Sequence, residues 1–275
     1  MKTLFALTLL LALGQSLPAT EQATVVIRRG NKPVLEYRYR DVPFKPYVAQ
    51  LYSPNGVAVL RDNVADHPHH HGLMFALEAG GVDFWAETPK CGRQVGRKIE
   101  TSATGFTQQL DWTTSDGKVL LNEERSVQVH DGPVTLLTWR SRLRAKDEIQ
   151  LTGHHYFGLG MRFPPSMDKI GKFINSANAT GDVVRGTERL TAANWCAYTA
   201  QGVTVALFDH SDNPRHPARM FTMTAPFAYQ SATLNLWKEP FLLKKPLDLR
   251  YGVAVWDGQP GRAEIEKLHQ HWLAR

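Results

Sequence analysis

Four of the chain's 11 histidines fall within five consecutive positions: His67, His69, His70 and His71. Imidazole is the side chain whose unperturbed pKa lies closest to neutrality, and neutral imidazole is also a common metal ligand. The segment is therefore a candidate for proton transfer, for metal binding, or for both. Pro68 cannot donate to a central ladder, so we expect a loop or edge that leads into a strand over Leu73–Ala79. In an extended chain, His70 points away from the other three rings.

A metal would need more ligands than this segment alone supplies. Alternate-residue spacing lets two imidazoles share an ion, but a closed zinc site needs a third or fourth ligand. The metal candidates are His67, His69 and His154, with His210 or Glu87 as further donors. The HExxH motif is absent. A divalent metal, metal-free acid/base or ligand contacts, and structural hydrogen bonding all stay open here.

A second polar group lies on a predicted strand over Gly153–Phe163. Its odd positions are mostly apolar and should face the core. The even positions are His154, Tyr156, Gly158, Gly160 and Arg162. A glycine within a strand often marks the close approach of a ligand or another backbone. The pattern predicts a binding surface with a glycine floor, and the alternative is a solvated face with bulge glycines.

A third polar group follows the predicted strand Val203–Asp209. Its members are Asp209, His210, Asn213, Arg215 and His216. Loops at sheet ends often carry function, and the planar fork of Arg215 suits a carboxylate or paired hydroxyls. A surface turn is the alternative reading. If this loop lies beside the other two groups, all three form one site, because convergent polar groups are typical of binding sites.

The elements that must position these residues are nearly all strands. Gly30-Asn31, Asp116-Gly117 and Asp131-Gly132 separate alternating runs, which is typical of hairpins. Period-2 patterns such as Leu247–Asp257 indicate one buried face. The only convincing helix covers Arg262–Leu273. We therefore predict an all-β fold, a large antiparallel β-sandwich with one C-terminal helix.

The N-terminus and the charge distribution limit where the protein works. Residues 1–19 resemble a signal peptide, with Lys2 before an apolar run, so residues 20–275 should form one exported domain, periplasmic or secreted. No other stretch is apolar enough for a membrane span. The net charge of +6 is scattered, which argues against a nucleic-acid partner. Cys91 and Cys196 either form a disulfide or stay as buried thiols.

Several short motifs resemble one bacterial exported family. They are Arg61-Asp62, Asp66-His67-Pro68-His69-His70, Val82-Asp83-Phe84-Trp85, Gly158-Leu159-Gly160-Met161-Arg162 and Asn213-Pro214-Arg215-His216-Pro217. The chain resembles the family called "methane oxygenase PmoA-like", a domain of unknown function. His71 departs from the pattern, in which a basic residue such as Arg is expected. The resemblance implies a fold similar to the galactose-mutarotase-like supersandwich, whose concave face binds sugars through histidines, arginines and carboxylates.

The residues and the resemblance together favour an exported carbohydrate-active enzyme of the epimerase, mutarotase or lyase type. His69 or His70 would form an acid/base pair with His154. The expected ligand-binding residues are Arg61, His67, Tyr156, Arg162, Asp209, His210, Asn213, Arg215 and His216. The partner would be a small molecule or an oligosaccharide. The alternatives are a non-catalytic sugar-binding protein and a metal-dependent oxidoreductase or hydrolase.

Overall fold

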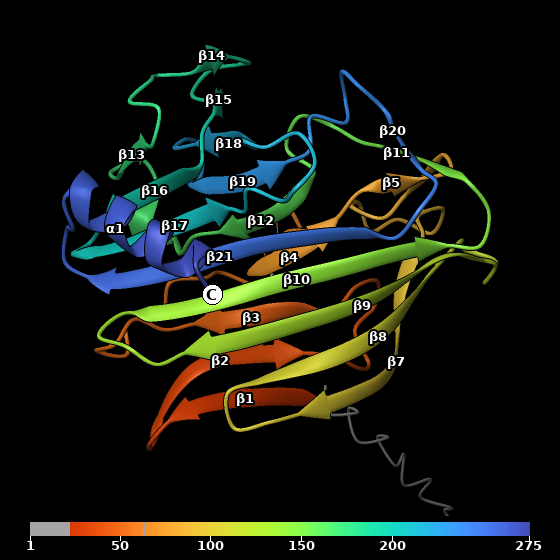
Figure 1. Ribbon diagram of the computed structural model, residues 1–275, viewed down its shortest axis with the longest axis horizontal. Helices are drawn as coiled ribbons and strands as arrows, with labels where there is room; N and C mark the ends of the chain where they lie inside the picture. The colour runs from red at the N-terminus through yellow and green to blue at the C-terminus, as the bar shows by residue number, and fades with distance from the viewer. Residues whose placement is uncertain (1–22, 63, 66) are drawn as a thin grey trace, which may run out of the picture.

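The computed structural model describes residues 23–62, 64–65 and 67–275, and its architecture is all-β (Figure 1). Within these residues the strands form antiparallel sheets of nine, eight and four strands. One α-helix, α1 (Arg262–Leu273), and one 3-10 turn (Pro165–Met167) complete the described part of the chain. The predicted all-β sandwich with a C-terminal helix is therefore confirmed.

The nine-stranded sheet runs in the order β1 (Thr24–Arg29), β2 (Lys32–Arg38), β3 (Tyr47–Leu51), β4 (Leu73–Ala76), β12 (Gly158–Arg162), β19 (Tyr229–Thr233), β18 (Arg219–Met223), β15 (Arg189–Ala192) and β14 (Asp182–Val183). The eight-stranded sheet runs in the order β13 (Lys172–Asn175), β16 (Trp195–Ala200), β17 (Val203–Asp209), β21 (Leu247–Asp257), β10 (Thr135–Ala145), β9 (Val119–His130), β8 (Gly105–Thr113) and β7 (Arg93–Thr101). A smaller sheet comprises β20 (Phe241–Leu243), β11 (Ile149–Thr152), β5 (Glu78–Ala79) and β6 (Val82–Asp83).

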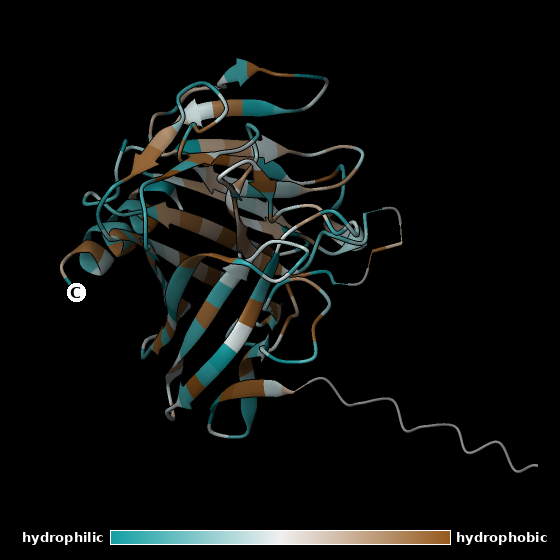
Figure 2. Ribbon diagram, turned by 90° about the vertical axis from the view of Figure 1, so that its right-hand side faces the viewer, coloured by the Kyte–Doolittle hydropathy of each residue, from teal (hydrophilic) through white to brown (hydrophobic). Residues whose placement is uncertain are grey.

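The two large sheets enclose the main apolar core. Val48 and Met161 from the nine-stranded sheet belong to the same buried cluster as Trp139 and Tyr251 from the eight-stranded sheet. Along β9 buried and more exposed residues alternate, as the period-2 pattern predicts. Figure 2 shows hydrophilic (teal) and hydrophobic (brown) bands along several of the strands. Each large sheet therefore has an inner face on the core and an outer face that is free to carry a site.

Helix α1 covers part of the outer face of the eight-stranded sheet. Ile265 and Trp272 on the helix are fully buried in a second apolar cluster with Phe208 and Ala254 from the sheet. The nine-stranded sheet has its outer face on the opposite side of the sandwich. Sites on the two outer faces are therefore separated by the whole core.

The predicted strand over Gly153–Phe163 is shorter in the structure, where β12 begins at Gly158. The backbone N–H of Phe157 donates to the carbonyl of His154 at 3.1 Å, which closes a turn before the strand. His154 and Tyr156 therefore do not share a strand face with Arg162. Cys91 and Cys196 are both free, buried thiols. None of the described helices is long and apolar enough to cross a membrane, and the predicted signal peptide lies outside the described residues.

Candidate functional site

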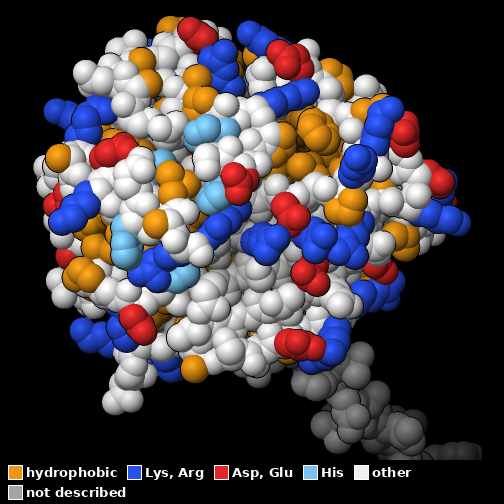
Figure 3. All heavy atoms as spheres, in the orientation of Figure 1, with side chains coloured by type: hydrophobic (Ala, Val, Ile, Leu, Met, Phe, Trp, Pro, Cys, Tyr) orange, Lys and Arg blue, Asp and Glu red, His pale blue; other side chains and the backbone are white. Residues whose placement is uncertain are grey.

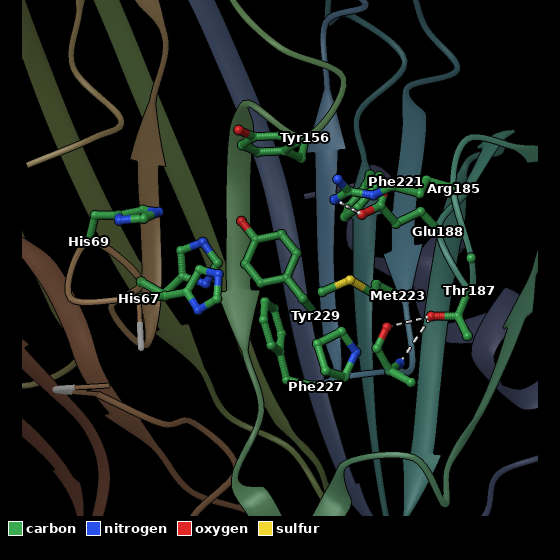
Figure 4. A pocket seen from close by; sticks show the side chains of 14 residues that line it. His67, His69, Tyr156, Arg185, Thr187, Glu188, Phe221, Met223, Phe227 and Tyr229 are labelled. Atoms are coloured by element: carbon green, nitrogen blue, oxygen red, sulfur yellow. Dashed lines mark hydrogen bonds and ion pairs between the residues drawn. The ribbon is translucent and has the colours of Figure 1, made fainter. Parts of the chain in front are cut away.

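A cavity of about 380 Å³ opens on the outer face of the nine-stranded sheet. Three histidines, His67, His69 and His70, line one side. The aromatic residues Tyr156, Phe227 and Tyr229 line its middle, and Phe221, Arg185, Thr187 and Glu188 line the far side. Figure 4 shows the histidine segment and the turn before β15 facing one another across Tyr229. We call this cavity the histidine pocket.

The histidine segment is a loop, as predicted, but it forms a turn, so the alternation of rings expected for an extended chain does not occur. The backbone N–H of His70 donates to the carbonyl of His67 at 2.8 Å. Because the chain turns at Pro68, the ring of His70 stacks on that of His67 with centroids 4.8 Å apart, and the His69 ring lies 4.5 Å from the His70 ring. Three rings therefore share one wall, which an extended chain could not have achieved.

His70 is held as a neutral hydrogen-bond donor. Nη1 of Arg162 lies 3.1 Å from Nδ1 of His70. A guanidinium can only donate, so Nδ1 carries the lone pair and the neutral ring keeps its proton on Nε2. Burial, followed by repulsion from the rings of His69 and His67 in their protonated forms, lowers the pKa of His70 to about 2. At neutral pH this ring can stabilise negative charge on an oxygen, but it cannot act as a base through Nδ1.

His69 is better placed to accept a proton. It lines the pocket and is only partly buried. Burial, with smaller contributions from the positive charges of Lys45 and His67, lowers its pKa below the ordinary value. The ring is therefore mainly neutral at neutral pH, which is the form that a general base requires.

The expected glycine floor is covered by an aromatic ring. Gly160 faces the outer side of the sheet as predicted, but a Cβ there would collide with the hydroxyl of Tyr229. The glycine therefore makes room for this side chain rather than for a ligand. Burial raises the pKa of Tyr229 well above its ordinary value, and burial together with Asp83 raises that of Tyr156. Both phenols stay protonated and can serve as donors.

The far wall carries a carboxylate that the sequence analysis did not single out. Glu188 is 6% exposed, and its Oε1 accepts from Arg185 at 2.7 Å. Its Oε2 is buried and makes no hydrogen bond in the described part of the chain, and Nε2 of His155 is 3.6 Å from it. Glu188 follows a turn of ordinary polar residues, and no spacing to other titratable residues marks it as part of a site. Only the fold brings it opposite the histidines.

His71 leaves the pocket and belongs to a buried ionic network. Its Nδ1 lies 2.9 Å from Asp62, and its Nε2 lies 2.8 Å from Glu87, which also accepts from Lys45 at 2.6 Å. Its ring stacks on Tyr47 with centroids 4.0 Å apart. Although burial acts in the opposite direction, the two carboxylates raise the pKa of His71. This network ties the end of the histidine segment to the loop that carries Glu87.

Besides the residues of the Asp209–His216 loop, three predicted site residues lie outside the pocket lining. His154 is exposed, and its ring stacks on Tyr156 with centroids 5.7 Å apart. It is therefore a neighbour of the pocket rather than part of its wall. Arg61 is partly buried and pairs with Asp168 at 3.9 Å. Arg162 lies behind the wall, 1% exposed, with its guanidinium over the ring of Phe227.

The Asp209–His216 loop does not join the histidine pocket, so the expected single convergent site is wrong. Asp209 is buried and accepts from the backbone N–H of Ala218 at 2.8 Å, from Asn213 at 2.7 Å, and pairs with His216 at 2.7 Å. Arg215 donates to the carbonyl of Leu234 at 2.9 Å and to two further carbonyls. These hydrogen bonds join the side chains of the loop to one another and to the backbone of neighbouring segments. His210 and Asn213 line a different hollow.

The metal candidates do not form a ligand set together. In the described part of the chain no group of three His, Cys, Asp or Glu side chains is arranged to hold a metal ion. His67 and His69 line the pocket, but His154 does not. Nδ1 of His70 already accepts from Arg162, which removes that atom as a ligand.

Residues 24–270 of the chain match the sequence model of a protein family described as "Family of unknown function (DUF6807)". This match does not confirm the PmoA-like name. A search of curated proteins finds no match. Among solved structures, "Polysaccharide Lyase BACCELL_00875" is similar at 8% identity and a TM-score of 0.42, over 87% of this chain and 34% of that one. A 4-alpha-glucanotransferase from Thermococcus litoralis is similar at 9% identity and a TM-score of 0.33, over 86% and 39%. The chain thus spans little more than a third of either protein.

Proposed function

The chain belongs to the family of unknown function DUF6807, and we propose that it is an exported carbohydrate-active enzyme with its active site in the histidine pocket. The reaction would be a proton transfer on a sugar or glycoside, of the epimerase, mutarotase or lyase type. The observation that carries the proposal is the lining of the pocket. Imidazoles and a buried carboxylate face each other across two phenols.

The pocket combines the two kinds of surface that a sugar needs. Phe221, Phe227 and Tyr229 offer aromatic faces that can stack on the apolar face of a pyranose ring. The imidazole and phenol groups around them can bind ring hydroxyls. An apolar wall with a few convergent polar groups is the usual composition of a small-molecule site.

Each polar side chain suits one role in a proton transfer. The neutral ring of His69 would take a proton from the sugar, and the phenol of Tyr156, which keeps its proton, would return one to the departing or opening oxygen. The Nε2–H of His70 would stabilise negative charge as it develops on an oxygen. Glu188 would bind a hydroxyl or act as a second base from the far wall.

A panel of neutral and acidic oligosaccharides, followed by proton NMR, tests the proposal directly. We expect at least one to be epimerised, anomerised faster than in buffer, or cleaved. His69→Gln should lower that rate by about 100-fold or more, the usual contribution of a general base. His154→Gln is the matched control, since it removes an exposed imidazole next to Tyr156 and should change the rate little.

Two results would favour the alternatives. A ligand that saturates the protein but is recovered unchanged would indicate a sugar-binding protein. Stoichiometric metal in protein purified without a histidine tag, lost in a His67→Ala variant, would indicate the metal-dependent enzyme.

A further inference from the structure

A second polar hollow of about 430 Å³ lies on the opposite side of the sandwich, on the outer face of the eight-stranded sheet. Strands β9, β10 and β21 and the loop after β17 surround it. Its lining includes Ser126, Thr138, Arg140, His210, Arg250 and Arg275. Figure 3 shows Lys, Arg and His side chains on this face of the molecule, with Asp and Glu side chains among them. We call this hollow the arginine groove.

Like charges oppose each other across the strands of this groove. Arg140 on β10 is the direct cross-strand partner of Arg250 on β21. Directly opposed like charges destabilise a sheet. Asp248 binds Arg140 at 3.0 Å and lies 3.6 Å from Arg142. Arg250 forms no ion pair with a carboxylate in the described part of the chain, and the charges that act on it are those of Arg140 and, in the opposite direction, Asp212.

The guanidinium of Arg250 is fixed in position by the helix. It lies over the indole of Trp272, 5.6 Å from the ring centroid. Gly252 allows this packing, because a Cβ there would lie 2.9 Å from the indole. The indole Nε1–H donates to Thr138 in the groove at 2.8 Å. The guanidinium of Arg250 is therefore already ordered before a ligand binds, which reduces the entropy lost on binding.

His210 lies between two donors and can satisfy only one. The backbone N–H of Asp212 points at its Nδ1 at 3.1 Å, and Nη1 of Arg250 lies 3.2 Å from its Nε2. A neutral imidazole has a single lone pair, so either tautomer leaves one N–H facing another. The His210 side chain is only 6% exposed. Burial and then Arg250 lower the pKa of His210, while Asp212, whose Oδ2 lies 3.6 Å from Nδ1, acts in the opposite direction. The ring is therefore mainly neutral at neutral pH. An acceptor oxygen next to Nε2 and Nη1 would satisfy both donors.

We propose that the arginine groove binds the carboxylate of an acidic sugar such as a uronic acid. One carboxylate oxygen accepts from Nη1 of Arg250 and from the Nε2–H of His210. The planar fork of Arg250 suits a carboxylate, which accepts two parallel hydrogen bonds. The hydroxyl of Ser126 also lines the groove and can bind a sugar hydroxyl. This site is independent of the histidine pocket on the other side of the core.

The indole N–H resonance of Trp272 is a direct reporter of this groove. The chain has seven tryptophans, so a proton–nitrogen NMR spectrum of the full chain shows few indole peaks, and a Trp272→Phe variant assigns the one needed. Titration with sodium glucuronate should shift this peak with a saturable, millimolar dependence. Trp85, which packs on Tyr156 and Tyr229, reports the histidine pocket separately. Binding in the arginine groove is therefore tested separately from the proposed activity of the histidine pocket.

Two variants and two further titrants complete the test. Arg250→Gln should weaken glucuronate binding at the Trp272 peak by about tenfold or more, as expected for a lost charge-assisted hydrogen bond. Arg144→Gln removes an exposed arginine further along β10 and should change binding less than about twofold. Glucose and inorganic phosphate should bind more weakly than glucuronate. The proposal is overturned if glucuronate leaves the Trp272 peak unmoved, if phosphate or glucose binds equally well, or if both variants behave alike.

Discussion

Arg162 and His70 are 92 positions apart in the chain, and Nη1 of the arginine donates to Nδ1 of the histidine at 3.1 Å. Both side chains are buried. This single contact settles which nitrogen of His70 carries the proton, and it separates the role of His70 from that of His69. Two neighbouring imidazoles therefore have different chemistry.

The tautomer of His70 can be measured by nitrogen-15 NMR of its ring. We expect the Nε2–H form across the pH range in which the protein stays folded, because burial and nearby positive charges lower the pKa of His70 to about 2. Arg162→Met removes the donor and its charge, so the pKa of His70 should rise. The exposed ring of His154 is the internal control. Titration of His70 near pH 6.5 in the unmodified protein would contradict the assignment.

Glu188→Gln tests the carboxylate on the far wall. Its amide keeps the shape of the side chain but cannot accept a proton or bear a charge, so turnover of whichever glycan the panel identifies should fall by about 100-fold. The melting temperature should change little. Arg185, the ion-pair partner of Glu188, is exposed, so loss of the carboxylate does not leave a buried charge unpaired. Arg185→Gln is the control and should retain most activity. Equal rates for the two variants would remove Glu188 from the mechanism.

Gly160→Ala should destabilise the fold around the pocket. The added Cβ would collide with the buried hydroxyl of Tyr229, and overpacking of this kind costs about 1–3 kcal/mol. Urea denaturation gives the free energy of unfolding. Gly261→Ala is a suitable control, since nothing lies within 4 Å of the added atom and its φ of −69° suits alanine. If the two variants were equally stable, Tyr229 would not occupy this position.

The His71 network should make stability depend on pH with a definite sign. Its hydrogen bonds to Asp62 and Glu87 raise the folded-state pKa of His71 above the unfolded value of about 6.5. The stabilisation is therefore complete below about pH 6.5 and is lost as the pH rises through the folded-state pKa. His71→Gln should lower the free energy of unfolding by about 3 kcal/mol at pH 6, and by less at pH 9. A difference that grew with pH would contradict this sign.

The sequence by itself determined the strands and much of the local chemistry. Period-2 alternation, as in Leu247–Asp257, depends only on which side chains are apolar, and it predicted the sandwich correctly. The apolar stripe of Arg262–Leu273 predicted the helix in the same way. The clustering of His67, His69 and His70 was equally visible, because those residues are neighbours in the chain.

Only the tertiary structure decided which distant residues meet. The turn at Pro68 brought the three rings together, the sheet order placed Glu188 opposite them, and Tyr229 covered Gly160. The same topology put the Asp209–His216 loop on another side of the core, where its polar side chains bind one another and the backbone of neighbouring segments. Strand pairing depends on contacts between residues far apart in sequence, and a local pattern does not encode them.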